Sequence, residues 1–113
     1  MTILLLNKDK GETSFSSIKQ AQKILNFKKA GHAGTLDPLA TGLLPIFFNQ
    51  STKFIQYFNT ESKEYIADFI IGLSSNTEDI TGYLSYELNS SEPTQDELKK
   101  AIDEFYGKSL QIP

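Results

Sequence analysis

The segment at residues 31–42 reads Gly31-His32-Ala33-Gly34-Thr35-Leu36-Asp37-Pro38-Leu39-Ala40-Thr41-Gly42. It holds three glycines, a histidine and an Asp-Pro pair, and its apolar residues follow neither a helical nor a strand period. We therefore expect a loop between two regular elements. A folded protein seldom gathers so many glycines unless its backbone must approach something closely, so this loop is the candidate functional site.

Taken separately, the residues of this loop have ordinary explanations. Asp37 followed by Pro38 is a favoured start of a type I turn. A lone histidine such as His32 is more often a packed or exposed imidazole than a catalytic group. The glycines do not form a phosphate-binding loop, because the Gly-x-x-x-x-Gly-Lys spacing is missing. Function is therefore indicated only by the string as a whole.

The chain before the loop predicts one strand and one helix. Residues 3–6 are a short apolar run, typical of a buried strand, and residues 7–11 are polar and predict a loop. Ser14 is placed to cap a helix over residues 14–29, because apolar positions recur there at helical spacing. Gly31 is expected to stop that helix.

The chain after the loop predicts strands and a short helix. Residues 43–48 predict a strand, and Ser51 is expected to cap a helix that presents one apolar face, formed by Phe54, Ile55 and Phe58. Residues 65–71 are apolar on both faces, as in a covered strand. Residues 83–88 alternate as an edge strand does.

A last helix is marked by a capping box of Thr94 and Glu97, and Gly107 is expected to close it. Its apolar stripe consists of Leu98, Ala101, Ile102 and Phe105. About four or five strands and three helices without strict alternation predict an α+β fold, with helices packed on a mixed or antiparallel sheet. We expect residues 1–113 to form a single folding unit.

Composition restricts the kinds of site that are possible. The chain has no cysteine and one histidine, which argues against disulfides, thiolate metal sites and a zinc or iron site made by protein ligands alone. No apolar run approaches the ~20 residues of a membrane span. Residues 1–6 lack the basic start and cleavage site of a signal peptide. We therefore expect a soluble, cytoplasmic protein that uses neither metal nor cofactor.

The net charge of −3 conceals an asymmetry along the chain. Residues 1–60 carry seven lysines and three acids, whereas residues 61–113 carry four lysines and eleven acids. The first half could face phosphates, and its lysines could equally form a solvated surface. If they bind a polyanion, neutralising Lys28 and Lys29 together flattens the salt dependence of binding.

The loop and its surroundings resemble the TruB family of tRNA pseudouridine synthases. The similarity to the family's signature loop runs from Gly31 through Leu43-Leu44-Pro45 and on to Ser51-Thr52-Lys53. Upstream, residues 5–14 are similar to the family's Lys-Pro-x-Gly-x-Thr-Ser opening. Downstream, the similarity includes Lys63-Glu64-Tyr65, residues 72–82 and Gln111-Ile112-Pro113.

The resemblance implies an incomplete pseudouridine synthase catalytic domain, of which residues 1–113 are the N-terminal portion. It implies conversion of uridine to pseudouridine at position 55, in the T-loop of tRNA, without metal or organic cofactor. The family's catalytic aspartate falls on Asp37, which would act as a nucleophile or as a base. It implies no membrane and no obligatory protein partner.

The same resemblance implies a substrate-binding set around Asp37. Tyr65 matches the family's tyrosine that stacks on the extracted base, and His32 matches a histidine near the displaced base. Lys8 matches the lysine of the opening motif, for which positioning and phosphate contact are both open. Gly31 and Thr35 belong to the signature loop and complete the set.

The sequence also departs from the family pattern. Asp9 replaces the usual proline of the opening motif, Ala33 stands where threonine is frequent, and Asn76 stands where an aspartate is common. In the family the motif at the end of this chain continues, and the later segment holds the arginine that pairs with the catalytic aspartate. We therefore expect the 113-residue chain alone to be inactive.

Two other classes of function remain open. The chain could be an RNA-binding module without catalysis, or a structural domain with an incidental Asp-Pro turn. Retention of both Asp37 and Tyr65 favours the enzyme over the binding module, because a carboxylate facing RNA phosphates has no use in binding alone.

Overall fold

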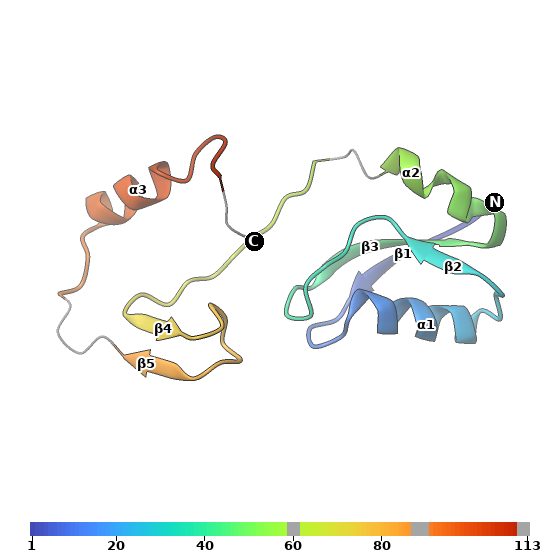
Figure 1. Ribbon diagram of the computed structural model, residues 1–113, viewed down its shortest axis with the longest axis horizontal. Helices are drawn as coiled ribbons and strands as arrows, with labels where there is room; N and C mark the ends of the chain where they lie inside the picture. Colours follow the sequence, from blue (N-terminus) through green and yellow to red (C-terminus); the bar gives the residue numbers. More distant parts are fainter. Residues whose placement is uncertain (59–61, 87–90, 111–113) are drawn as a thin grey trace. The chain divides into compact units, whose positions relative to one another are not determined.

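Figure 1 shows the computed structural model, which describes residues 1–58, 62–86 and 91–110. The chain forms two compact units, Met1–Tyr65 and Ile66–Pro113. That residues 1–113 act as a single folding unit stays a prediction.

The first unit is built on a three-stranded antiparallel sheet in the order β1-β3-β2. Its strands are β1 (Thr2–Lys8), β2 (Ala30–His32) and β3 (Gly42–Phe48). The strands predicted at residues 3–6 and 43–48 are confirmed. The apolar residues of β1 are half-buried or exposed rather than buried, and only Lys8 at its end is fully buried.

Alternate residues of the central strand β3 form most of the core. The core cluster consists of Ile18, Ala21, Leu44, Ile46 and Phe48. Because successive side chains of a strand point to opposite faces, Phe47 faces away from this cluster. It packs edge-on against Phe58, with ring centroids 5.0 Å apart. Figure 1 shows α1 (Ser14–Ile24) and α2 (Ile55–Phe58) on the two sides of this sheet.

Two serines predicted to cap helices have other partners. The N-cap of α1 is Thr13, whose side chain accepts the N–H of Ser16 at 3.0 Å, and Ser14 is the first helical residue. Ser51 lies inside the 3-10 helix η1 (Asn49–Phe54) that precedes α2. Its buried hydroxyl accepts the N–H of Thr2 at 2.9 Å. Ser51 therefore ties η1 to the start of β1.

Helix α1 ends at Ile24 and not at residue 29. Asn26 adopts a left-handed backbone with φ of 53°, and the N–H groups of residues 26 and 27 return to the carbonyls of residues 23 and 22. This is the pattern with which Asn or Gly stops a helix. Gly31 is consequently not the stop and lies in β2, while Lys28 and Lys29 follow the helix.

The second unit contains an antiparallel pair, β4 (Leu73–Ser75) and β5 (Leu84–Tyr86), and α3 (Gln95–Asp103). Glu87 and Leu88, the end of the predicted edge strand, lie outside the described residues. The strand predicted at residues 65–71 is wrong: these residues are exposed, and nothing in the described chain pairs with them. Apolar character alone does not make a strand, because its backbone groups need a hydrogen-bonded neighbour.

Helix α3 begins with the predicted capping box. The Thr94 hydroxyl accepts the Glu97 N–H, and the Glu97 carboxylate accepts the Thr94 N–H at 2.8 Å. The bond from the Thr94 N–H, with a second from the Thr94 hydroxyl to the same carboxylate at 2.7 Å, holds the pKa of Glu97 below its usual range. The α+β prediction is confirmed, since helices accompany antiparallel sheets in both units. Within the described ranges, no helix is long and apolar enough to cross a membrane.

Candidate active site

The loop between β2 and β3 turns at Asp37. The carbonyl oxygen of Asp37 accepts the N–H of Ala40 at 3.0 Å, so the predicted Asp-Pro turn is present. The Asp37 side chain is exposed, and its carboxylate makes no hydrogen bond within the described residues. A turn and an available carboxylate therefore coexist at this residue.

The residue before Asp37 is held by helix α1. The Ser14 hydroxyl is buried, donates to the carbonyl oxygen of Leu36 at 3.1 Å and accepts the N–H of Leu36 at 3.0 Å. The half-buried Leu36 side chain packs against the core cluster. Both polar backbone groups of Leu36 are thus satisfied by one side chain.

The residue after Asp37 is held by the end of β1 and the loop that follows it. The carbonyl oxygen of Pro38 accepts the N–H of Gly11 at 2.7 Å and the ammonium group of Lys8 at 3.2 Å. The same ammonium donates to the carbonyls of Asp9 at 2.9 Å and Glu12 at 2.7 Å. Lys8 is fully buried, and its ammonium group joins three carbonyls from two loops inside the unit.

The start of the loop is organised by His32. Its Nδ1 lies 2.7 Å from the carbonyl oxygen of Gly34. Because a carbonyl oxygen only accepts, Nδ1 carries the hydrogen, and Nε2 is the remaining ring nitrogen. Gly34 has a φ of 79°, which side chains rarely allow, and a Cβ there would lie 3.0 Å from the Lys63 ammonium nitrogen.

The predicted site residues are only partly brought together. Lys8, His32, Thr35 and Asp37 belong to the loop or contact its backbone, and Thr35 is exposed. Gly31 lies in the middle of β2, directly before His32. A Cβ added at Gly31 would lie 2.8 Å from the end of the Ile55 side chain.

Tyr65 is the residue predicted to stack on the base. It is 57% exposed, so its ring is available for stacking. No hydrogen bond or aromatic contact joins it to the loop among the described residues. Its assignment to the site therefore depends on the family resemblance.

Three residues of this region were missed in the sequence. Ser14 was interpreted as a helix cap, and Gly11 and Lys63 were given no role. The Thr13-Ser14 pair offered a signal, since only one of two adjacent hydroxyls can be the cap and the other is then free to bond elsewhere. Both Gly11 and Lys63 stand in motifs that resemble the family, but no local signal predicted that they lie against this loop.

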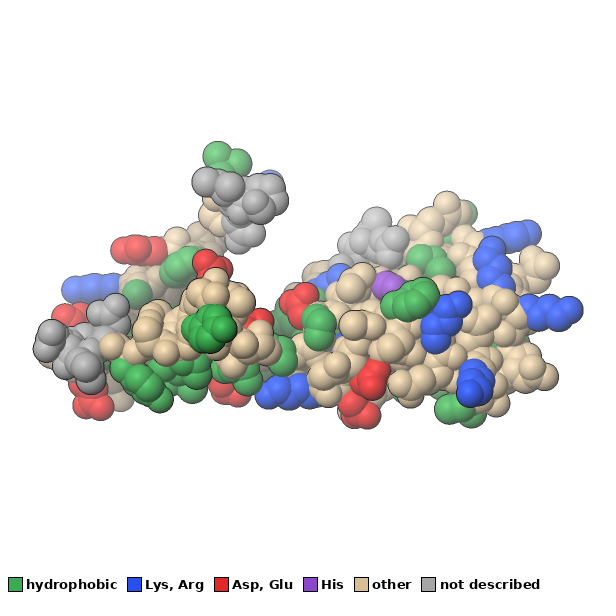
Figure 2. All heavy atoms as spheres, turned by 60° about the horizontal axis from the view of Figure 1, so that its bottom comes forward, with side chains coloured by type: hydrophobic (Ala, Val, Ile, Leu, Met, Phe, Trp, Pro, Cys, Tyr) green, Lys and Arg blue, Asp and Glu red, His purple; other side chains and the backbone are tan. Residues whose placement is uncertain are grey.

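Charge is distributed unevenly over the surface. Figure 2 shows lysine side chains spread over the first unit, while acidic side chains are frequent on the second. Residues 1–58, 62–86 and 91–110 contain no group of three His, Cys, Asp or Glu side chains suited to hold a metal ion. The chemistry available at the loop is that of one carboxylate, one imidazole and nearby lysines.

The chain matches the family described as TruB family pseudouridylate synthase (N terminal domain) over residues 22–113. The tRNA pseudouridine synthase B of Bacillus pumilus (strain SAFR-032) is 42% identical over 112 residues, which cover 98% of this chain and 36% of the relative. That of Legionella pneumophila (strain Lens) is 40% identical over 111 residues, with 98% and 37% covered. A solved archaeal box H/ACA sRNP Nop10-Cbf5 complex includes a chain that is 41% identical, with a TM-score of 0.47 and 48% and 18% covered. The chain spans about a third of the length of the curated relatives it matches.

Proposed function

Because this chain belongs to the TruB family of pseudouridylate synthases, we propose that the protein carrying it converts uridine to pseudouridine in tRNA. The relatives named tRNA pseudouridine synthase B support tRNA as the substrate. The specific target is the T-loop uridine at position 55, which the resemblance of the signature loop implies. The reaction is an isomerisation: the glycosidic bond breaks at N1, the base turns, and C5 bonds to the same ribose carbon. C5 loses its hydrogen to solvent as a proton and N1 takes one up, so atoms balance.

Asp37 is the catalytic carboxylate. The observation that carries this assignment is an exposed carboxylate on a turn whose two flanking residues are fixed by buried side chains. A carboxylate held in this way can approach the ribose or the base without first ordering its own backbone. It then attacks a carbon as a nucleophile or removes a proton as a base, and both routes remain open.

Lys8 and Ser14 are positioning residues in this proposal. A lysine that contacts phosphate must present its ammonium group to solvent, whereas that of Lys8 is enclosed by three backbone carbonyls. Of the two roles considered for Lys8, burial therefore supports positioning. Ser14 acts on the other side of Asp37 through Leu36.

Of the remaining predicted residues, Tyr65, His32 and Thr35 would contact the RNA. The exposed Tyr65 ring stacks on the extracted base. His32 offers Nε2 as an acceptor for a ribose or base donor while Nδ1 stays bonded to Gly34. Thr35 offers an exposed hydroxyl beside Asp37. Gly31 keeps β2 close to Ile55 and so acts on the shape of the site rather than on substrate.

The test is Asp37→Asn in the full-length protein, assayed by tritium release from C5-labelled uridine in tRNA. The amide is nearly isosteric but is neither a nucleophile nor a base, so turnover is abolished while tRNA binding changes little. Asp9→Asn, which removes another exposed carboxylate of the same unit, is the matched control and retains turnover. Near-normal turnover by Asp37→Asn would refute the assignment. Tritium retention by the unmodified protein, with tRNA still bound, would identify a binding module.

A further inference from the structure

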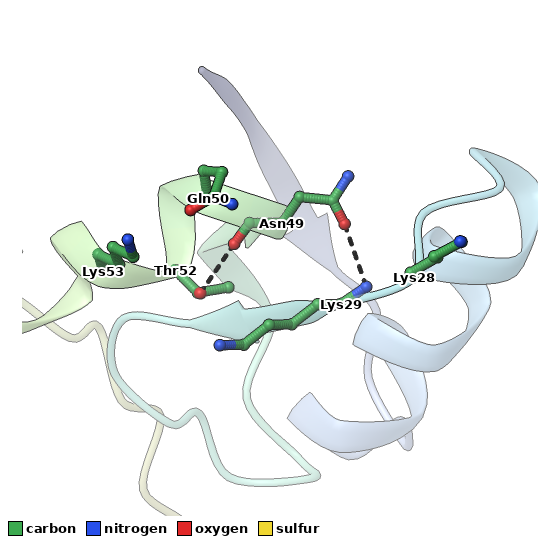
Figure 3. Close-up of a pocket in the computed structure, with 6 residues that line it drawn as sticks. All are labelled: Lys28, Lys29, Asn49, Gln50, Thr52 and Lys53. Carbon is green, nitrogen blue, oxygen red and sulfur yellow. Dashed lines mark hydrogen bonds between the residues drawn. The ribbon is translucent and has the colours of Figure 1, made fainter.

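A shallow hollow on the first unit is rich in positive charge and lies outside the Asp37 loop. Its lining, drawn in Figure 3, consists of Lys28, Lys29, Asn49, Gln50, Thr52 and Lys53. These residues come from two segments, the connection that leads into β2 and the helix η1. We call this surface the basic hollow. Three of its side chains are cations, three are neutral amides or hydroxyls, and none is an acid.

The two segments are fixed to each other at Asn49. Its N–H donates to the carbonyl oxygen of Lys29 at 2.8 Å, and its side-chain oxygen accepts the N–H of Lys29 at 3.2 Å. The Thr52 hydroxyl donates to the carbonyl oxygen of Asn49 at 2.9 Å. Asn49 itself has a φ of 50°, which Asn tolerates better than most residues. The backbone of the hollow is therefore ordered before any ligand arrives.

The side chains occupy different ends of the hollow. In Figure 3 the Lys29 side chain runs along β2 toward the end where Lys53 lies, and Lys28 lies at the opposite end. The Asn49 amide turns its oxygen to Lys29 and its nitrogen away from β2, so an N–H donor remains on the rim. Ammonium groups beside amide and hydroxyl donors form a set that suits phosphate oxygens and ribose hydroxyls.

We propose that the basic hollow binds the sugar-phosphate backbone of the RNA substrate. This inference rests on the proposed function, because it assumes that the ligand is tRNA. The three residues of β2, about 10 Å of strand, separate Lys29 from the loop that holds Asp37. A contact here would orient the RNA from outside the Asp37 loop, without reading its sequence.

The lysines of α1 provide a contrast within the same unit. Lys19 and Lys23 are exposed on the helix, and Lys19 lies over the Phe15 ring at 5.3 Å from its centroid. Neither lines the hollow, and they match the solvated surface that lysines usually form. They supply a control that removes the same charge from the same unit.

The experiment compares Lys29→Gln/Lys53→Gln with Lys19→Gln/Lys23→Gln in the full-length protein. The dissociation constant for tRNA is measured between 50 and 200 mM salt. Affinity falls as salt rises, and the loss of two phosphate contacts makes the slope of log affinity against log salt about 1.5 less steep. Between 50 and 200 mM salt, the hollow variant should therefore lose about tenfold less affinity than the unmodified protein loses. The α1 variant keeps the unmodified slope. Lys29→Arg/Lys53→Arg retains the charge and also keeps it.

Two further measurements separate the possible failures. Equal slopes for the hollow and α1 variants would overturn the proposed RNA contact. Weaker binding of poly-glutamate by the hollow variant, with tRNA binding unchanged, would also overturn it and would assign the hollow to an acidic protein. Thermal unfolding checks that the Gln variants are folded. If the double variant is not, the single variants Lys29→Gln and Lys53→Gln decide the point, since each loses one phosphate contact and should make the slope about 0.7–0.9 less steep. Pseudouridine formation at saturating tRNA is measured in a separate assay. If the protein proves not to catalyse the proposed reaction, the salt dependence of tRNA binding still tests whether the hollow contacts RNA.

Discussion

The hydroxyl of Ser14 bonds both polar backbone groups of Leu36, although 22 residues separate them in the chain. This pair fixes the residue immediately before the proposed catalytic Asp37. On the other side of Asp37, the Pro38 carbonyl is held by Lys8 and Gly11. The position of Asp37 therefore depends on side chains that need not touch the substrate.

Replacing Ser14 with Ala should lower both stability and turnover. The substitution leaves the backbone N–H and carbonyl of Leu36 without their partner, at a cost of about 1–3 kcal/mol in the free energy of unfolding. Turnover should fall more than tRNA affinity, because the loop loses its geometry. Ser17→Ala is the matched control, since Ser17 is buried on the same helix and makes no bond to the loop. Chemical denaturation and the tritium assay measure the two effects, and equal behaviour of the two variants would contradict this role.

Lys8→Met distinguishes positioning from phosphate contact. Methionine keeps an unbranched stem but removes the donor to three carbonyls, so stability should fall by at least about 1–3 kcal/mol and kcat should fall. The salt dependence of tRNA binding should not change. A slope lower by about 0.7–0.9 would instead show that Lys8 contacts a phosphate. Lys10→Met, at an exposed position of the same loop, serves as the control.

Tyr65→Ala should lower turnover about 5- to 150-fold, the range expected when one base loses its stacking partner. Tyr65→Phe should retain most of the activity, because it keeps the aromatic face. Tyr83→Ala, which removes another exposed tyrosine, should have no effect on the tritium assay. If Phe were as damaging as Ala, the hydroxyl would be the important group.

Asp79 should make the β4–β5 turn sensitive to acid. Bonds from the side chain of Thr81, then the side chain of Thr77 and the N–H of Thr81, hold the pKa of Asp79 below its usual range. Since the folded pKa is depressed, the stabilisation is present above about pH 4 and is lost as pH falls through the lowered pKa. Thr81→Val should raise the pKa in a carboxyl-carbon NMR titration. An unchanged titration would show that these bonds do not form in solution.

The 113-residue chain by itself should not turn over tRNA, even with Asp37 present. The family resemblance implies that an arginine from a later segment pairs with Asp37, and all eleven basic residues of this chain are lysines. Lysine does not reproduce the two-pronged pairing of arginine. The tritium assay compares the chain alone with the chain mixed with the remainder of the protein. Turnover by the chain alone would show that the later segment is not required.

Local signals predicted much of the fold correctly. The capping box at Thr94 and the apolar run of β3 needed only residues close in sequence, and both were confirmed. The end of α1 was misplaced, although Asn26 offered a local signal, because Gly31 was taken as the stop. The strand prediction for residues 65–71 was wrong for a different reason. Their apolar pattern suits a strand, but whether that strand forms depends on a partner that is distant in sequence.

The sequence by itself determined the family, the Asp-Pro turn and the candidate carboxylate at Asp37, because the signature is a continuous string. Only the tertiary structure decided what Lys8 and Ser14 do. Lys8 bonds the Pro38 carbonyl 30 residues away as well as two carbonyls of its own loop, and Ser14 bonds Leu36 22 residues away. A backbone carbonyl or N–H has no identity that a sequence pattern could reveal. Whether a lysine faces solvent or is enclosed by carbonyls is settled when distant segments pack together.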